Sequence, residues 1–334
     1  MIQLQPPFLL FLGNAPRLTD LKTAAGVLQW RRDDCLAECV SHDDTPTLGL
    51  PRMTPETAAA QGARSLLVGV APLGGRLDPS WLPTLTAALD ANLVIVSGLH
   101  NRLTSYPTLV AAARGRPDAL LDLRVPPTDL SVGTGRPRNG KRVLTIGSDC
   151  AVGKKYTALA MTQGLQARGV SASFHATGQT GLMIAERGVP LDAVPADFIS
   201  GAVEHLTPEA DAEHWQIIEG QGALHHPAYA GVSLGLLHGA QADALVLCHD
   251  PHRTHLEDLE SFAIPPLREI IADAEHAARR TNCNARCIGV ALNTVALSAF
   301  AAGEACAAFE AELQLPVTDP MRHGPERLLN ALLV

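Results

Sequence analysis

The sequence predicts an α/β protein built from two doubly wound parallel-sheet domains. In both halves of the 334-residue chain, short apolar runs alternate with segments in which apolar residues recur at helical spacing. A stretch rich in Pro and Gly at residues 126–140 separates the two halves, and the alternation restarts after it. The length suffices for two domains, and a hydrophobic content of 46% suffices to fill two cores.

The N-terminal half reads as a Rossmann-like domain over residues 1–127. Its β-rich apolar runs predict strands at 8–12, 36–40, 65–70, 93–97 and 120–125. Helical spacing predicts helices at 19–30, 79–91 and 106–114. The half contains no GxGxxG pattern, so we expect a structural layer rather than a dinucleotide site.

Residues 128–140 are expected to form a linker, and residues 141–334 a second α/β domain. The same patterns predict strands at 142–146, 171–176, 214–218, 244–248 and 287–292. They predict helices at 154–168, 266–280 and 298–313.

Composition excludes several classes of partner. A formal net charge of -8 gives no overall support for capture of nucleic acid or of an anionic membrane. The apolar run at residues 6–12 is too short to span a bilayer and has no basic flank. Seven scattered cysteines favour free thiols in a reducing compartment, so we expect a cytoplasmic protein. Because two-domain α/β proteins of this size often form symmetric dimers, we expect a homodimer.

A phosphate-binding loop is predicted at the start of the second domain. The strand at 142–146 leads into a loop with glycines at both ends, and a helix begins at Lys154. Backbone N–H groups and the positive end of the helix dipole would face a bound anion, and Lys154 would add a full charge. The residues expected to bind the phosphates of a cofactor are Gly147, Ser148, Asp149, Cys150, Ala151, Val152, Gly153, Lys154, Lys155 and Tyr156.

Two departures from the common loop bear on its ligand. Five residues rather than four separate Gly147 from Gly153, a form that resembles the loop of dethiobiotin synthetase. Lys155 stands where a Ser or Thr would coordinate Mg²⁺. Two of the chain's four lysines could therefore neutralise a phosphate without a metal ion, and Mg²⁺ is not expected to be essential. A loop of this kind fits coenzyme A, whose phosphates contribute to binding but do not react, better than it fits a nucleotide that is hydrolysed.

Other candidates follow strands of the same domain. Glu219 ends an apolar strand and precedes two glycines, so it is either a residue beside the phosphate or a helix cap. Gln179 and Thr180 lie in a segment rich in Gly and hydroxyl groups after another strand, where we expect them to line the site. The histidines, His226 among them, lack the spacing of a zinc site, and no metal is expected. Cys150 could carry an acyl group, but phosphate loops need small residues for steric reasons, which is enough to explain a cysteine at this position.

These segments together resemble the D-glutamate N-acetyltransferase family over nearly the whole chain. The resemblance rests on Gly-Ser-Asp-Cys-Ala-Val-Gly-Lys at 147–154 and Ala-Thr-Gly-Gln-Thr-Gly at 176–181, and on segments 219–229, 232–239, 247–251 and 315–320. It implies a Rossmann-like domain followed by a P-loop NTPase-like domain, and transfer of an acetyl group from acetyl-CoA to D-glutamate in D-glutamate catabolism.

Acetyl transfer to an amine needs a base, donors for the oxyanion and a clamp for the substrate carboxylates. Glu219 or His226 is the candidate base, and Arg253 and Arg322 are the candidate clamp. Direct transfer is favoured over an acyl-enzyme at Cys150. Two alternatives stay open at this point: an ATP- and Mg-dependent ligase or carboxylase resembling dethiobiotin synthetase, and a non-catalytic nucleotide-sensing protein.

Overall fold

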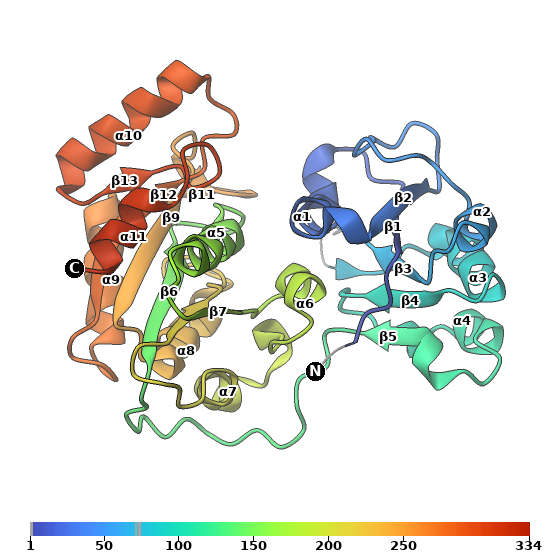
Figure 1. Ribbon diagram of the computed structural model, residues 1–334, viewed down its shortest axis with the longest axis horizontal. Helices are drawn as coiled ribbons and strands as arrows, with labels where there is room; N and C mark the ends of the chain where they lie inside the picture. Colours follow the sequence, from blue (N-terminus) through green and yellow to red (C-terminus); the bar gives the residue numbers. More distant parts are fainter. Residues whose placement is uncertain (1–2, 71, 73–74) are drawn as a thin grey trace. The chain divides into compact units, whose positions relative to one another are not determined.

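The computed structural model describes residues 3–70, 72 and 75–334, and the chain forms two compact units (Figure 1). Unit 1 comprises residues 1–125 and 179–190, and unit 2 comprises residues 126–178 and 191–334. Each unit contains one parallel sheet with helices packed on it. The predicted α/β class with two parallel sheets is therefore confirmed. Residues 179–190, expected inside the second domain, pack instead with unit 1.

Unit 1 has a five-stranded sheet in the order β2-β1-β3-β4-β5. All six residues of β1 are buried, as expected of a central parallel strand covered on both faces. The strands are β1 (Phe8–Gly13), β2 (Cys35–Val40), β3 (Ser65–Val68), β4 (Val94–Ser97) and β5 (Leu120–Asp122). The helices are α1 (Lys22–Trp30), α2 (Pro55–Ala60), α3 (Leu82–Asp90), α4 (Pro107–Ala112) and α6 (Gln179–Ala185).

Helix α6 is held in unit 1 by specific contacts. Thr180 Oγ1 lies 3.1 Å from Thr23 Oγ1 of α1, and Arg31 Nη1 lies 2.6 Å from Glu186 Oε1. A Cβ on Gly98, directly after β4, would lie 2.3 Å from Gln179 Oε1. Glycine is therefore required at this end of β4 for the start of α6 to pack there.

Unit 2 has a six-stranded sheet in the order β13-β12-β9-β6-β8-β7. Its strands are β6 (Lys141–Gly147), β7 (Ala172–His175), β8 (Trp215–Ile218), β9 (Ala244–His249), β12 (Arg286–Leu292) and β13 (Val317–Thr318). Its helices are α5 (Lys154–Ala167), α7 (Ile199–Leu206), α8 (Ala230–Ala240), α9 (Leu267–Ala278), α10 (Ala299–Leu313) and α11 (Glu326–Leu332). The strands β10 (His255–Leu256) and β11 (Leu259–Ala263) form a separate antiparallel hairpin.

The central position of β6 defines the site of unit 2. It pairs in parallel with β8 on one side and β9 on the other, with Leu144 opposite Ile218 and Gly147 opposite Cys248. The carboxyl ends of the three strands therefore meet, which is where ligands bind in such sheets. Helix α5 leads away from this edge and packs on β6 (Figure 1).

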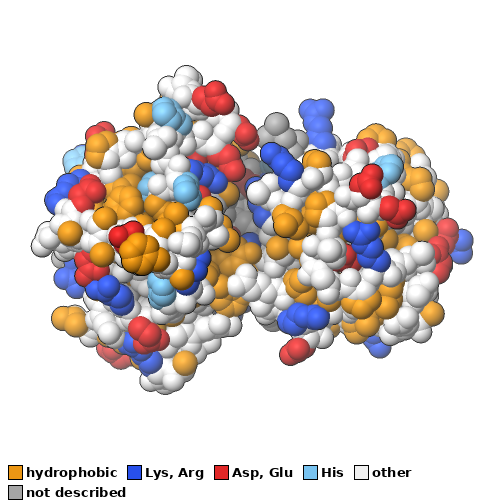
Figure 2. All heavy atoms as spheres, turned by 90° about the horizontal axis from the view of Figure 1, so that it is seen from above, with side chains coloured by type: hydrophobic (Ala, Val, Ile, Leu, Met, Phe, Trp, Pro, Cys, Tyr) orange, Lys and Arg blue, Asp and Glu red, His pale blue; other side chains and the backbone are white. Residues whose placement is uncertain are grey.

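The surface of each unit mixes the two signs of charge. Acidic and basic side chains are interspersed over the visible faces in the space-filling view (Figure 2). None of the helices formed by the described residues has the length and apolar character needed to cross a membrane.

Candidate functional site

The loop between β6 and α5 folds tightly around the side chain of Lys154. Ala151 and Gly153 adopt left-handed backbone conformations, with φ of 55° and 105°. A Cβ on Gly147 would lie 2.8 Å from the carbonyl oxygen of Asp149 and 2.7 Å from Lys154 Nζ, so glycine is required at the start of the loop. Lys154 is only 7% exposed, and its Nζ donates a hydrogen bond of 2.7 Å to the carbonyl oxygen of Asp149.

Lys154 is a buried cation whose charge a bound anion would stabilise. Burial lowers the pKa of Lys154, whereas Cys150, Cys248, Asp149 and Glu219 act in the opposite direction. A phosphate at the N-terminus of α5 would add to the groups that keep the ammonium charged. The loop therefore has the cation, the helix end and the turn geometry of an anion-binding site.

The side chain of Asp149 is bound by the protein itself. Asp149 is fully buried, and its Oδ1 accepts a hydrogen bond of 2.6 Å from the amide of Cys150. Its Oδ2 accepts from Arg253 Nη1 and from the amide of Glu257, both at 2.8 Å. Arg253 Nη1 also donates to the carbonyl oxygen of Cys150 at 2.7 Å. These contacts tie the loop to the segment that follows β9.

A serine and a histidine form a second link between the same two segments. Ser148 Oγ lies 2.8 Å from His249 Nδ1, and both residues are buried. Burial lowers the pKa of His249 to about 4, so its ring is neutral at pH 7. A neutral ring can accept a hydrogen bond at Nδ1 from the hydroxyl of Ser148 and so fix the rotamer of that side chain.

Glu219 lies at the carboxyl end of β8, as its place in the sequence predicts. It is 5% exposed, and its Oε2 accepts hydrogen bonds from the amides of Thr177 and Gly178 at 3.0 and 3.2 Å. Burial raises the pKa of Glu219, while Lys155, the two amides and Lys154 lower it. Glu219 thus belongs to the same group of charges as the two lysines.

The glycine after Glu219 allows the strand end to approach the loop. A Cβ on Gly220 would lie 1.7 Å from the carbonyl oxygen of Thr145 and 3.0 Å from Lys154 Cδ. The amide of Gly220 donates to Thr145 Oγ1 at 2.9 Å. Glycine at this position therefore makes room for both β6 and the Lys154 side chain.

His226 lies next to the loop, and its hydrogen bonding fixes its tautomer. One ring nitrogen of His226, one carboxylate oxygen of Asp149 and Cys150 Sγ all lie within 4.8 Å of one another. His226 Nδ1 accepts a hydrogen bond of 3.1 Å from the amide of Ala228, so the proton of the neutral ring is on Nε2. In this state His226 offers a hydrogen-bond donor and not a base.

Among the residues that the structure describes, two groups of side chains have the spacing of metal ligands. In the group of Asp149, Cys150 and His226, the carboxylate of Asp149 is already paired with Arg253. The other group consists of His225 with Glu269 and Asp273 of α9, and both acids are exposed. The expectation that the protein holds no metal stays a prediction.

The remaining predicted residues fall in several places. Gln179 and Thr180 belong to unit 1, whereas the loop belongs to unit 2. Arg322 is exposed after β13 and donates to Thr294 Oγ1 at 3.2 Å and to the carbonyl oxygen of Leu297 at 3.0 Å. Burial raises the pKa of Tyr156, whose ring centroid lies 4.7 Å from Lys155 Nζ.

Sequence reasoning assigned no specific role to Thr177, His249 or Glu257, which all touch groups of the site. Thr177 did lie in the segment that was expected to line the site, and His249 was among the histidines that were considered. Each follows or ends a strand of the sheet or lies in the segment after β9, so the sheet order was the signal needed to find them. That order cannot be read from one sequence.

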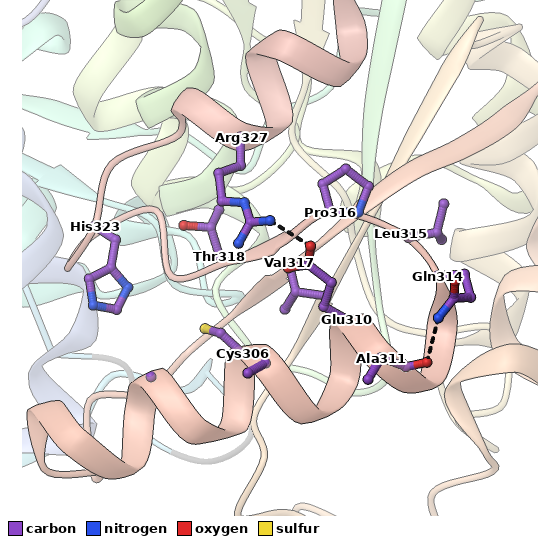
Figure 3. Close-up of a pocket in the computed structure, with 12 residues that line it drawn as sticks. Cys306, Glu310, Ala311, Gln314, Leu315, Pro316, Val317, Thr318, His323 and Arg327 are labelled. Carbon is purple, nitrogen blue, oxygen red and sulfur yellow. Dashed lines mark hydrogen bonds and ion pairs between the residues drawn. The ribbon is translucent and has the colours of Figure 1, made fainter.

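A separate groove of about 810 Å³ lies between α10, β13 and α11 (Figure 3). Arg327 of α11 reaches across it, and its Nη2 lies 2.5 Å from Glu310 Oε1 of α10. The residues that line the groove lie between Gly303 and Arg327, so they do not include the loop. The groove is therefore not part of the anion site.

Both halves of the chain match models of known domain families. Residues 131–329 match the model of DUF1611, a P-loop domain of unknown function, and residues 34–126 match its N-terminal Rossmann-like domain. A D-glutamate N-acetyltransferase of Tritonibacter scottomollicae is 44% identical over 329 residues, covering 98% of this chain and 99% of the relative. A protein of the same name from a Pseudoalteromonas species is 42% identical over 328 residues, covering 98% and 99%.

A solved structure agrees with the fold. The crystal structure of a DUF1611 family protein from Anabaena variabilis is 34% identical and superposes with a TM-score of 0.89, covering 98% of this chain and 99% of that one. The expected Rossmann-like and P-loop domain types are thereby confirmed.

Proposed function

The chain belongs to the D-glutamate N-acetyltransferase family, and on this premise we propose that it transfers the acetyl group of acetyl-CoA to the amine of D-glutamate. The main support for the proposal is that two proteins of that name are 44% and 42% identical to this chain over nearly its whole length. The products would be N-acetyl-D-glutamate and CoA, in the catabolism of D-glutamate.

The loop supports acetyl-CoA as the donor. Its left-handed residues, the N-terminus of α5 and the buried Lys154 form an anion site. We assign the phosphates of CoA to residues 147–156. Lys155 occupies the loop position at which a Ser or Thr would hold Mg²⁺, and its charge lowers the pKa of Glu219. The site therefore needs no Mg²⁺ in this proposal.

Glu219 is the base that the geometry supports better. Its Oε2 is held by two amides, whereas its Oε1 accepts no hydrogen bond from the described residues. Burial raises its pKa, which brings a carboxylate closer to the strength a general base needs. In the proposed step, Glu219 takes a proton from the substrate ammonium, the amine attacks the thioester carbonyl carbon, and the carbon–sulfur bond breaks. The attacking nitrogen still carries one extra proton at this point, and the departing CoA thiolate takes it, which gives the amide and the CoA thiol. Glu219 then releases the first proton to water.

Other side chains would stabilise and orient the reactants. His226 can donate from Nε2 to the thioester oxygen as negative charge develops on it. Arg322 is exposed, and we keep it as a candidate clamp for a substrate carboxylate. Gln179 and Thr180 also stay candidates for substrate binding.

These assignments constrain the shape of the bound donor. The thioester of acetyl-CoA is separated from its phosphates by the pantetheine arm, whereas Glu219 and His226 both lie at the loop. The arm must therefore fold back toward the loop, so that the phosphates bind the loop while the thioester carbon lies beside Glu219 and His226.

The test is release of CoA from acetyl-CoA with D-glutamate, with L-glutamate and with no acceptor, each with and without EDTA. We expect rapid release with D-glutamate that EDTA does not change. ATP turnover in place of CoA release would contradict the proposal and select a ligase.

We further propose a cytoplasmic location and a homodimeric assembly. All seven cysteines are free thiols, which favours a reducing compartment such as the cytoplasm. We propose a homodimer on the frequency of such assemblies, to be checked by light scattering.

A further inference from the structure

Segment 249–257, here called the brace, begins at the last residue of β9 and holds the phosphate loop from one side. The loop side of these contacts consists of Ser148, Asp149 and Cys150. Arg253 makes two of them with one nitrogen, because its Nη1 lies 2.8 Å from Asp149 Oδ2 and 2.7 Å from the carbonyl oxygen of Cys150. The brace is thus bound to three consecutive residues of the loop.

Arg253 neutralises an acid that would otherwise oppose ligand binding. Asp149 is fully buried within a loop that is built to receive an anion. An unpaired carboxylate there would carry a desolvation cost and would repel a phosphate. The guanidinium of Arg253, with 19% of its side chain exposed, supplies the opposite charge at this point.

Arg253 also orients a peptide of the loop. In a trans peptide the carbonyl and the following N–H point in opposite directions. Because the carbonyl of Cys150 points to Arg253, the N–H of Ala151 points away from Arg253. Ala151 has a φ of 55°, a conformation that a non-glycine residue keeps only where its surroundings enforce it.

The surroundings of Arg253 disfavour a substrate carboxylate on its guanidinium. Its Nε lies 3.6 Å from Asp250 Oδ2 and its Nη2 lies 3.3 Å from Glu257 Oε1, in addition to the contact with Asp149. Three carboxylates already surround the single positive charge. A carboxylate of D-glutamate would be a fourth.

We propose that Arg253 is a positioning residue that holds loop 147–155 in its anion-binding shape through Asp149 and the Cys150 carbonyl, and that it does not bind D-glutamate. The inference rests on the proposed function for its kinetic readout and replaces the sequence-based assignment of Arg253 as a clamp. Its consequence is that binding of the CoA phosphates, and not of the amino acid, depends on Arg253.

The kinetic test compares Arg253→Gln with the double variant Arg253→Gln, Asp149→Asn. We expect Arg253→Gln to raise the KM for acetyl-CoA about tenfold and to leave the KM for D-glutamate unchanged. Removing the charge of Asp149 in the same chain should restore part of the loss. Arg279→Gln is the matched control, since Arg279 directly follows α9 and pairs with Glu275 of that helix at 2.8 Å, outside both loop and brace. A raised KM for D-glutamate with no restoration by Asp149→Asn would overturn the proposal.

A binding test separates this inference from the proposed function. CoA itself is titrated calorimetrically into the wild type, Arg253→Gln and Arg253→Lys, and amide hydrogen exchange of residues 147–155 is followed without ligand. We expect Arg253→Gln to weaken CoA binding and speed exchange in the loop, with Arg253→Lys in between, because an ammonium cannot reproduce the guanidinium contacts. Unchanged affinity and exchange would refute the positioning role. Absence of turnover with D-glutamate in a wild type that binds CoA would instead refute the proposed acceptor.

Discussion

His249 gives a prediction whose size follows from its burial. Its pKa falls from 6.5 to about 4 in the folded protein because the ring is buried beside Ser148. The unfolded chain therefore binds a proton near pH 6.5 that the folded chain does not bind until about pH 4, so stability is lost as the pH falls through this window. At 1.36 kcal/mol per pKa unit, the loss reaches about 3 kcal/mol at pH 4.

The assay is the free energy of unfolding, from urea titrations at several pH values between 4 and 7. His249→Asn keeps a hydrogen-bond acceptor near Ser148 but removes the titrating ring, so we expect its stability to vary less with pH than that of the wild type. His205→Asn, at the exposed end of α7, is the control and should follow the wild type. If His249→Asn retains the full wild-type slope, burial of His249 does not set the acid sensitivity.

Three further outcomes test the site. Gly220→Ala should lower stability by about 1–3 kcal/mol and reduce activity, since its Cβ would lie 1.7 Å from the carbonyl oxygen of Thr145; Gly303→Ala, with nothing within 4 Å of its Cβ, should do neither in the same melting and turnover assays. Cys150→Ala should keep most of the turnover, because the contacts to Asp149 and Arg253 use backbone atoms of Cys150; loss of activity together with an acetylated wild-type Cys150 peptide would establish an acyl-enzyme. Glu219 should act deprotonated, so kcat should rise with pH through its raised pKa, and Glu219→Gln should lose this limb of the profile; an unchanged profile would exclude it as the base.

The loop between β6 and α5 could be predicted because all of its parts are close together in the sequence. The strand, the two glycines and Lys154 are neighbours along the chain, and their local geometry follows from backbone freedom and from the helix end. The place of Glu219 at a strand end beside the loop followed from the parallel sheet, whose strands end at one edge.

The contacts of Arg253 could not be predicted, because they join residues that are far apart in the sequence. Arg253 and Asp149 are 104 positions apart, and only the pairing of β6 with β9 brings their loops together. Without that pairing, an arginine after a strand looks as suitable for a substrate carboxylate as for a buried aspartate.

The packing of α6 was missed for a related reason. The segment at 176–181 has the glycines and hydroxyl groups of a loop, but a helix begins at Gln179 and packs against α1 of unit 1. The contact between Thr180 and Thr23 joins residues 157 positions apart. No local pattern tells which unit such a segment joins.

Two helices begin later than the sequence predicts, because a tighter 3-10 turn precedes each of them. Residues Leu18–Leu21 and Pro79–Trp81 form 3-10 turns, so α1 and α3 start later than apolar spacing predicts. The short helices α7 and α8 were not predicted, and both contain glycines within them.

The most direct test of the account compares two acetyl donors in the wild type and in Lys154→Ala, with D-glutamate as acceptor. Acetyl-CoA carries the phosphates assigned to the loop, and acetyl-pantetheine lacks them. We expect N-acetyl-D-glutamate from the wild type with both donors, a large preference for acetyl-CoA, and loss of that preference in Lys154→Ala. No acetylated product from the wild type, or an equal loss of activity with both donors in Lys154→Ala, would contradict a loop that holds the phosphates of CoA for acetyl transfer.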